Sequence, residues 1–178
     1  MKIRKICVLG GTGFVGRHLL ARLANRGYQL KMLTRHPQRH RDLAVLPDAE
    51  LIGADIRDPA ALLTHFADCD AVINLVGVLH DQGSSQGFQA LHVDLPVKII
   101  ETCRALGIKR LLHMSALHAD AAKGPSQYLF TKGEGEQRVM AATDLAVTCF
   151  KPSIIFGPKD NFYNQFAGLL KVFPVLPL

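Results

Sequence analysis

Short apolar runs alternate with amphipathic stretches along most of this 178-residue chain. The first apolar run, residues 3–9, leads through several glycines into an amphipathic stretch from Phe14 to Asn25, which predicts a strand, a tight turn and a helix. The same reading predicts strands at 30–33, 51–52, 71–76, 110–114 and 146–150, and helices at 59–66, 88–106 and 127–142. Strands that alternate with helices are typical of an α/β fold, so we predict a doubly wound parallel β-sheet with helices on both faces.

Individual residues add detail to three of the predicted helices. Asp58 and Ser126 each stand directly before a helix and are suited to cap it. Pro96 lies inside a predicted helix, where it removes one backbone hydrogen bond, so we expect a kink there. Gly133 and Gly135 lie inside the last helix, at a cost of about 1 kcal/mol each relative to alanine. We therefore expect another part of the chain to approach that helix closely.

The composition is that of an ordinary globular domain, with 48% hydrophobic and 20% charged residues. We expect a single domain over residues 1–178, without a secretory signal or a transmembrane span. The four cysteines lie far apart with no C-x-x-C, and the eight histidines form no helical pair. These spacings argue against a disulfide framework and against a metal site, and they make a reducing cytoplasm the expected location.

The charge is unevenly distributed. Residues 1–41 contain ten Lys or Arg and no acid, which leaves 11 of the 21 basic residues against all 15 acidic ones in the remainder. The N-terminal quarter is thus +10 and the rest is −4. Such asymmetry indicates a polyanionic ligand, an anionic membrane face or nucleic acid. Because no helix-turn-helix and no interleaved aromatic residues accompany the basic ones, we expect no binding of nucleic acid.

A glycine motif follows the first predicted strand. Residues 10–16 read GGTGFVG and contain the pattern G-x-G-x-x-G at the entrance to the first helix. Glycines there allow a tight turn and a close approach of a pyrophosphate to backbone N–H groups, at the positive end of the helix. The alternative is a glycine-rich turn without a ligand. The position between strand and helix favours a dinucleotide site, and hence a fold of the Rossmann type.

The second strand ends in Thr34 and Arg35, where a Rossmann domain that selects NAD would carry an acid for the ribose 2′-hydroxyl. No acid stands near this position. Arg35 is placed to pair with a 2′-phosphate, which favours NADP(H) while leaving NAD(H) open. The alternative is an ordinary solvated arginine.

Tyr128 and Lys132 are one helical turn apart, so their side chains share a face. An ammonium close to a phenol favours the phenolate, which would let Tyr128 act as a general acid or base near neutral pH. Lys132 could also bind cofactor ribose hydroxyls. The alternative is an exposed helical pair without a function. By contrast, His113 lies in a predicted strand and is expected to be a hydrogen-bonded core residue.

Together these residues resemble a known superfamily. The glycine motif, Asp55, the stretch NLVG at 74–77, Ser115 at a strand end, the Tyr128 and Lys132 pair, and KPSIIFGP at 151–158 resemble the extended and atypical short-chain dehydrogenases/reductases, of the NAD(P)-dependent epimerase/dehydratase type. Within that superfamily the chain looks like the group of the large nucleotide-binding accessory subunit of respiratory complex I.

The resemblance implies roles for individual residues. Tyr128 would be the proton donor or acceptor, Lys132 its partner, and Ser115 the group that polarises a substrate carbonyl. The residues implied in cofactor binding are Gly10, Thr12, Gly13, Phe14, Val15, Gly16, Thr34, Arg35, Asp55, Ile56, Val76, Gly77, Lys132, Pro152 and Ile155. Asp55 and Ile56 would flank the adenine, and the last two would line the nicotinamide.

The chain departs from the superfamily pattern in three places. Met114 precedes Ser115 where a Ser/Thr pair is usual, and Lys151 replaces a common arginine. The chain also stops where these proteins continue into a smaller substrate-binding part, so we expect most substrate-recognition residues to be missing. These departures affect the assignment of Ser115 and of the substrate more than that of the cofactor.

Two functions remain open. The first is an NADP(H)-binding oxidoreductase, epimerase or dehydratase that acts on a small carbonyl or hydroxyl compound. The second is a non-catalytic NADPH-binding protein with a structural or assembly role in a membrane respiratory complex. Both use the same nucleotide site, and both allow a homodimer formed through the helices at 88–106 and 127–142.

Overall fold

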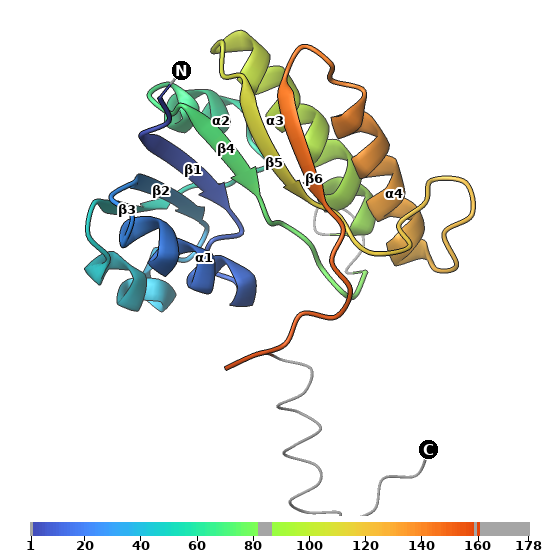
Figure 1. Ribbon diagram of the computed structural model, residues 1–178, viewed down its shortest axis with the longest axis horizontal. Coiled ribbons are helices and arrows are strands. Elements are labelled where there is room, and N and C mark those ends of the chain that lie inside the picture. The colour runs from blue at the N-terminus through green and yellow to red at the C-terminus, as the bar shows by residue number, and fades with distance from the viewer. Residues whose placement is uncertain (1, 82–86, 159, 161–178) are drawn as a thin grey trace, which may run out of the picture.

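The computed structural model describes residues 2–81, 87–158 and 160, and these form a six-stranded sheet in the order β3-β2-β1-β4-β5-β6 (Figure 1). Every neighbouring pair of strands is parallel. The strands are β1 (Lys5–Leu9), β2 (Gln29–Thr34), β3 (Ala49–Gly53), β4 (Ala71–Asn74), β5 (Arg110–Met114) and β6 (Ala146–Phe150). The predicted Rossmann-type parallel sheet is confirmed, whereas the part of the predicted domain from residue 161 onward lies outside the described residues.

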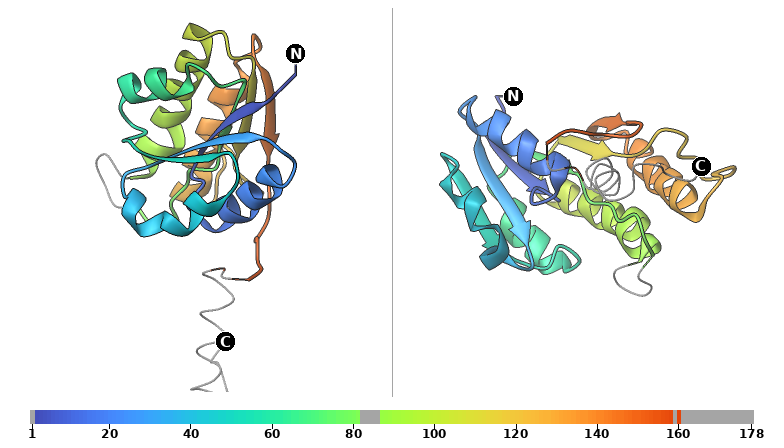
Figure 2. Two further views of the ribbon diagram at one scale, coloured as in Figure 1. Left: turned by 90° about the vertical axis from the view of Figure 1, so that its left-hand side faces the viewer. Right: turned by 90° about the horizontal axis from the view of Figure 1, so that it is seen from below.

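Helices cover both faces of the sheet, as predicted (Figure 2). One apolar core lies between the sheet and three helices, and includes Phe66, Ile99 and Val139. The other core lies under the first helix and a 3-10 segment, and includes Leu20 and Leu43. The helical segments are α1 (Phe14–Ala24), η1 (Pro37–Val45), α2 (Pro59–Phe66), η3 (Gln89–Asp94), α3 (Leu95–Ala105) and α4 (Gln127–Met140).

Two of the helices begin at the capping residues that the sequence indicates. The Asp58 side chain accepts a hydrogen bond from the Ala60 N–H at 3.0 Å, at the start of α2. The Ser126 hydroxyl accepts one from the Leu129 N–H at 3.2 Å, at the start of α4. Each cap satisfies a backbone donor that the first helical turn leaves without a partner.

The predicted kink at Pro96 takes another form. The chain forms a π-helical turn, η3, in which the Leu95 N–H donates to the carbonyl of Ala90 five residues earlier, and α3 then starts. Pro96 therefore lies in the first turn of α3, where a missing N–H costs little. The wide turn accommodates the proline before the α-helix begins.

The two glycines of α4 mark close contacts, as expected. A Cβ at Gly135 would lie 1.9 Å from the carbonyl oxygen of His92 in η3. A Cβ at Gly133 would lie 2.3 Å from the carbonyl carbon of Asp120. Both distances are far below van der Waals contact, so a side chain at either position would push α4 away from its neighbours.

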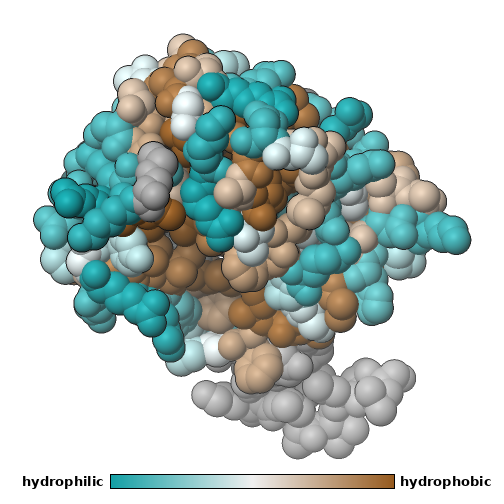
Figure 3. Space-filling view, turned by 45° about the horizontal axis from the view of Figure 1, so that its top comes forward, coloured by the Kyte–Doolittle hydropathy of each residue, from teal (hydrophilic) through white to brown (hydrophobic). Residues whose placement is uncertain are grey.

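The two faces of the sheet are covered unequally. Leu111 and His113 of β5 point toward α3 and α4, so Leu112 and Met114 point to the opposite face. Among the described residues, no helix covers that face over β5 and β6, where Phe150 is 48% exposed. Figure 3 shows apolar side chains lining a hollow in the middle of the face drawn, bordered by hydrophilic ones. Within the described ranges, no helix is long and apolar enough to cross a bilayer.

Candidate functional site

The candidate site lies at the carboxyl edge of the sheet, where the strand order reverses between β1 and β4. The turn from β1 to α1 holds Gly10, whose φ of +76° lies in the left-handed region that glycine tolerates. At Gly16 a Cβ would lie 2.5 Å from the carbonyl oxygens of Gly10 and Gly11, so α1 packs onto its own turn. This packing points the N-terminus of α1, with its N–H groups, toward the crevice.

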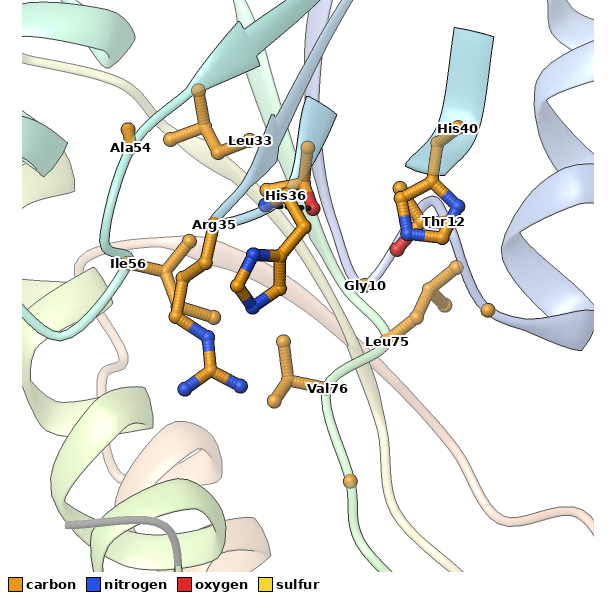
Figure 4. A pocket seen from close by; sticks show the side chains of 13 residues that line it. Gly10, Thr12, Leu33, Arg35, His36, His40, Ala54, Ile56, Leu75 and Val76 are labelled. Atoms are coloured by element: carbon orange, nitrogen blue, oxygen red, sulfur yellow. Dashed lines mark hydrogen bonds between the residues drawn. The ribbon is translucent and has the colours of Figure 1, made fainter. Parts of the chain in front are cut away.

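A cavity of about 320 Å³, the first cavity, opens beside this turn. Eight of the residues expected to bind a cofactor line it: Gly10, Thr12, Gly13, Thr34, Arg35, Ile56, Val76 and Gly77. Figure 4 shows the Arg35 side chain extending beside Ile56 toward Val76. The exposed guanidinium therefore stands at the mouth of a crevice whose floor is the glycine turn.

Five further residues line the first cavity that the sequence did not single out: Leu33, His36, His40, Ala54 and Leu75. His40 comes from η1, a segment without a predicted element. Its ring Nδ1 lies 3.0 Å from a nitrogen of Arg17, and Arg17 is also paired with Asp42 and donates to the carbonyl of Thr12. Burial and the Arg17 guanidinium lower the pKa of His40.

Asp55 is not among the residues that line the first cavity, although both of its neighbours are. Its carboxylate is bonded to Arg57, with Oδ1 2.8 Å from Nε and Oδ2 2.5 Å from Nη2. This pairing lowers the pKa of Asp55 to about 2. The expected contact with an adenine stays a prediction.

A second cavity of about 210 Å³ continues the first, since both are lined by Leu75, Val76 and Gly77. It brings together all three expected catalytic residues and the residues expected at the nicotinamide: Ser115, Tyr128, Lys132, Pro152 and Ile155. The two cavities thus form one groove along the carboxyl edge of β2, β1, β4 and β5.

Phe14 and Val15 lie at a different hollow, which they share with residues 155–158. The segment after β6 returns to α1 there, and the His18 ring nitrogen Nε2 lies 3.2 Å from the carbonyl oxygen of Pro158. This segment therefore reaches from the second cavity to the start of α1.

Lys132 is a buried cation. It is 3% exposed, and its Nζ donates to the carbonyl oxygen of Met114 at 2.5 Å. Burial lowers the pKa of Lys132 to about 8. Burial raises the pKa of Tyr128, which is opposite to the direction expected from a neighbouring ammonium. The half-buried Tyr128 ring meets the rings of Phe88 and His92 edge to face.

The hydroxyl of Ser115 is bonded outside the second cavity. Its Oγ donates to Oε2 of Glu136 at 2.6 Å, and Oε1 of Glu136 lies 2.9 Å from Nζ of Lys151. The carboxylate raises the pKa of Lys151 through this hydrogen bond. Sequence reasoning missed Glu136, although its spacing of four residues from Lys132 and eight from Tyr128 places it on the same helical face.

Two buried histidines lie behind the second cavity. His113 is 2% exposed with Nδ1 3.1 Å from Asn74 Nδ2, which agrees with its predicted role as a core residue. His92, which the sequence did not single out, accepts the Val78 N–H at Nε2 and lies 3.0 Å from Oγ1 of Thr131 at Nδ1. Burial and the Lys132 ammonium lower the pKa of His92 to about 4. His92 therefore links the loop after β4 to α4 as a neutral ring.

The groove has the chemistry of a dinucleotide site. A helix N-terminus and backbone N–H groups suit a pyrophosphate, and a buried ammonium beside a phenol suits proton transfer. Within the described part of the chain, no three His, Cys, Asp or Glu side chains are gathered to hold a metal ion. The residues present fit a nicotinamide dinucleotide because Gly10 and Gly16 allow the tight turn and the close packing of α1 that bring backbone N–H groups to the crevice.

Comparisons with known proteins agree with this geometry. The profile of the NAD dependent epimerase/dehydratase family matches residues 6–171. The chain is 33% identical over 176 residues to a 2-alkyl-3-oxoalkanoate reductase of Stenotrophomonas maltophilia, which covers 88% of the chain and 52% of that protein. It is 31% identical over 168 residues to subunit 9 of the mouse mitochondrial NADH dehydrogenase [ubiquinone] 1 alpha subcomplex, covering 90% of the chain and 43% of that subunit.

Solved structures share the fold. The UDP-glucuronic acid 4-epimerase of Bacillus cereus, solved in complex with NAD, superimposes with a TM-score of 0.79 at 19% identity, covering 94% of this chain and 64% of the epimerase. The chain spans about half the length of the curated relatives it matches.

Proposed function

Because the chain belongs to the NAD-dependent epimerase/dehydratase family, we propose that it binds NADP(H) in this groove and works as an oxidoreductase on a small carbonyl or hydroxyl compound. The observation that carries the proposal is the continuity of the two cavities. A nucleotide-binding end with Arg35 and a chemical end with Tyr128 and Lys132 meet at Val76 and Gly77.

The preference for NADP(H) rests on the charge at the end of β2. Arg35 is exposed at the mouth of the first cavity, with His36 and His40 in the same wall. Asp55, whose two neighbours in the chain line the cavity, is held in an ion pair with Arg57. A 2′-phosphate would meet the Arg35 guanidinium there, whereas selection of NAD needs an acid that accepts from the 2′-hydroxyl.

The chemical roles follow from the second cavity. A bound nicotinamide supplies hydride transfer; the chain supplies proton transfer and positioning. Tyr128 would hold or release a proton at its phenolic oxygen. Lys132 has three donors, of which Met114 O takes one, so donors remain for ribose hydroxyls and for the field at Tyr128. Ser115 would contact the oxygen of the substrate.

A second candidate is a protein that holds NADPH without turnover and stabilises a respiratory complex. Its support is the similarity to subunit 9 of the mouse NADH dehydrogenase 1 alpha subcomplex, together with the raised pKa of Tyr128, which disfavours the phenolate. The nucleotide site is the same in both candidates.

The test begins with the full-length protein and the nucleotide that co-purifies with it. We expect NADP(H) that exchanges within minutes, and oxidation of added NADPH in the presence of a 2-alkyl-3-oxoalkanoate ester. NADPH that is held through dialysis, with no turnover across a panel of ketones and alcohols, would instead support the second candidate.

A pair of variants then tests the chemical end. Tyr128→Phe removes only a hydroxyl, so turnover should fall about 10²–10⁴-fold while nucleotide affinity stays near that of the wild type. Lys132→Ala should lower both turnover and nucleotide affinity. Full turnover in Tyr128→Phe would contradict the assigned role.

A further inference from the structure

Ser115 forms its hydrogen bond away from the cavity that it lines. Its residue is 3% exposed, and its hydroxyl lies 2.6 Å from Oε2 of Glu136 on α4. A carboxylate accepts hydrogen bonds but does not donate them. Ser115 is therefore the donor of this pair, and its single proton points at Glu136.

Lys151 forms an ion pair with that carboxylate. Its Nζ lies 2.9 Å from Oε1, the other oxygen of Glu136, whose side chain is 20% exposed. A hydroxyl that donates to a carboxylate is held about twice as strongly as in a neutral pair. A hydroxyl has one proton and two lone pairs, so only acceptor capacity remains on Ser115.

We infer that Glu136 sets the hydrogen-bond polarity of the second cavity. Glu136 accepts the hydrogen bond of the Ser115 hydroxyl, so Oγ can only accept a hydrogen bond from a ligand. The cavity therefore binds a ligand whose hydroxyl donates to Oγ more tightly than a ligand that presents a carbonyl oxygen. The inference rests on the proposed function for the identity of the ligand, and on the Ser115–Glu136–Lys151 contacts for the polarity. This inference differs from the expectation that Ser115 polarises a carbonyl. To do so, the Ser115 hydroxyl would have to break its hydrogen bond to Glu136 and donate to the carbonyl oxygen instead.

A single substitution reverses the polarity. In Glu136→Gln, the amide oxygen is held toward the Lys151 ammonium, since that group only donates. The amide NH₂ then faces Ser115 and donates to Oγ, which frees the serine proton for the cavity. Glu134→Gln is the matched control, because Glu134 lies on the same helix and, among the described residues, forms no hydrogen bond with Ser115.

The first experiment needs no substrate. In proton NMR of the protein labelled at serine and glutamate, the Ser115 hydroxyl should exchange slowly and show a cross-peak to the γ-protons of Glu136. The signal should shift or vanish in Glu136→Gln and stay in Glu134→Gln. An unchanged signal in Glu136→Gln, or a wild-type proton directed away from Glu136, would overturn the inference.

The second experiment uses two probes of one shape, cyclohexanol with the NADPH-saturated protein and cyclohexanone with the NADP⁺-saturated protein, so that neither reacts. Glu136→Gln should weaken cyclohexanol about tenfold and strengthen cyclohexanone, while Ser115→Ala should abolish the difference. The same ratio of affinities in wild type and Glu136→Gln would overturn the inference. Failure of the wild type to bind the nucleotide or either probe would count against the proposed function, and the proton experiment alone would then decide the polarity.

Discussion

Replacing Lys132 by methionine should stabilise the fold and weaken nucleotide binding. Lys132 is 3% exposed, and burial lowers its pKa from 10.5 to about 8. At 1.36 kcal/mol for each pH unit, this difference means that the buried ammonium costs about 3 kcal/mol of folding free energy below pH 8. Methionine has a similar length and no charge. It loses the hydrogen bond to Met114 O, roughly 1 kcal/mol, so the net gain should be about 2 kcal/mol.

The pH dependence separates this effect from simple packing. Between pH 8 and 10.5 the unfolded wild type binds a proton at Lys132 that the folded protein has released, so wild-type stability rises with pH in that window. The advantage of Lys132→Met should therefore be largest at or below pH 8 and shrink toward pH 10.5.

Urea unfolding at pH 7 and pH 9.5 measures both predictions, and calorimetric titration with NADPH measures the loss of affinity. Arg138→Met, at an exposed position of the same helix, is the control and should change stability by less than about 0.5 kcal/mol. The reasoning would be wrong if Lys132→Met were less stable than wild type at pH 7, or if its advantage were the same at both pH values. Either result would mean that burial does not destabilise the ammonium.

Three other predictions concern other parts of the molecule. Arg35→Ala should reduce an expected tenfold preference for NADP(H) over NAD(H), about 1.4 kcal/mol, in calorimetric titrations with both nucleotides; an unchanged ratio would remove Arg35 from the site. Gly135→Ala should lower stability by about 3 kcal/mol in urea unfolding, against the helix propensity of alanine, because its Cβ would lie 1.9 Å from His92 O; a gain in stability would show that the contact relaxes freely. The free energy of unfolding should fall by about 3 kcal/mol from His92 alone as the pH drops from 6.5 to 4, since the unfolded chain takes up a proton at His92 that the buried ring does not. In His92→Gln the free energy of unfolding should depend less on pH in this range, and an equal dependence would contradict the low pKa of His92.

The sequence predicts the elements whose signals are local. The helix at 59–66 and the strands at 110–114 and 146–150 are found at those bounds, since caps and short apolar runs mark them. The 3-10 segment at 37–45 was missed because its polar residues carry no helical periodicity. The π-helical turn before Pro96 brings the His92 carbonyl against Gly135 of α4, a contact that no window of sequence contains.

The candidate site divides in the same way. Gly10, Arg35 and Tyr128 belong to motifs that can be read along the chain, and they line the groove. Glu136 and His92 acquire their places only through contacts between elements, with Ser115 and with the loop after β4. Such contacts join residues 14 to 21 positions apart, so spacing alone could suggest Glu136 and could not suggest its partner.

Because η3 approaches α4 closely, the effect of a substitution at Gly135 depends on the residues at positions 92 and 96. Pro96 offers no N–H to the carbonyl of His92, and that carbonyl occupies the space where a side chain at Gly135 would be. A residue with an N–H at 96 could draw the carbonyl back into the helix and open that space. Alanine at 135 would then be tolerated after a change at 96 and harmful before it, so a descendant of this protein could acquire the two changes in one order and not in the other.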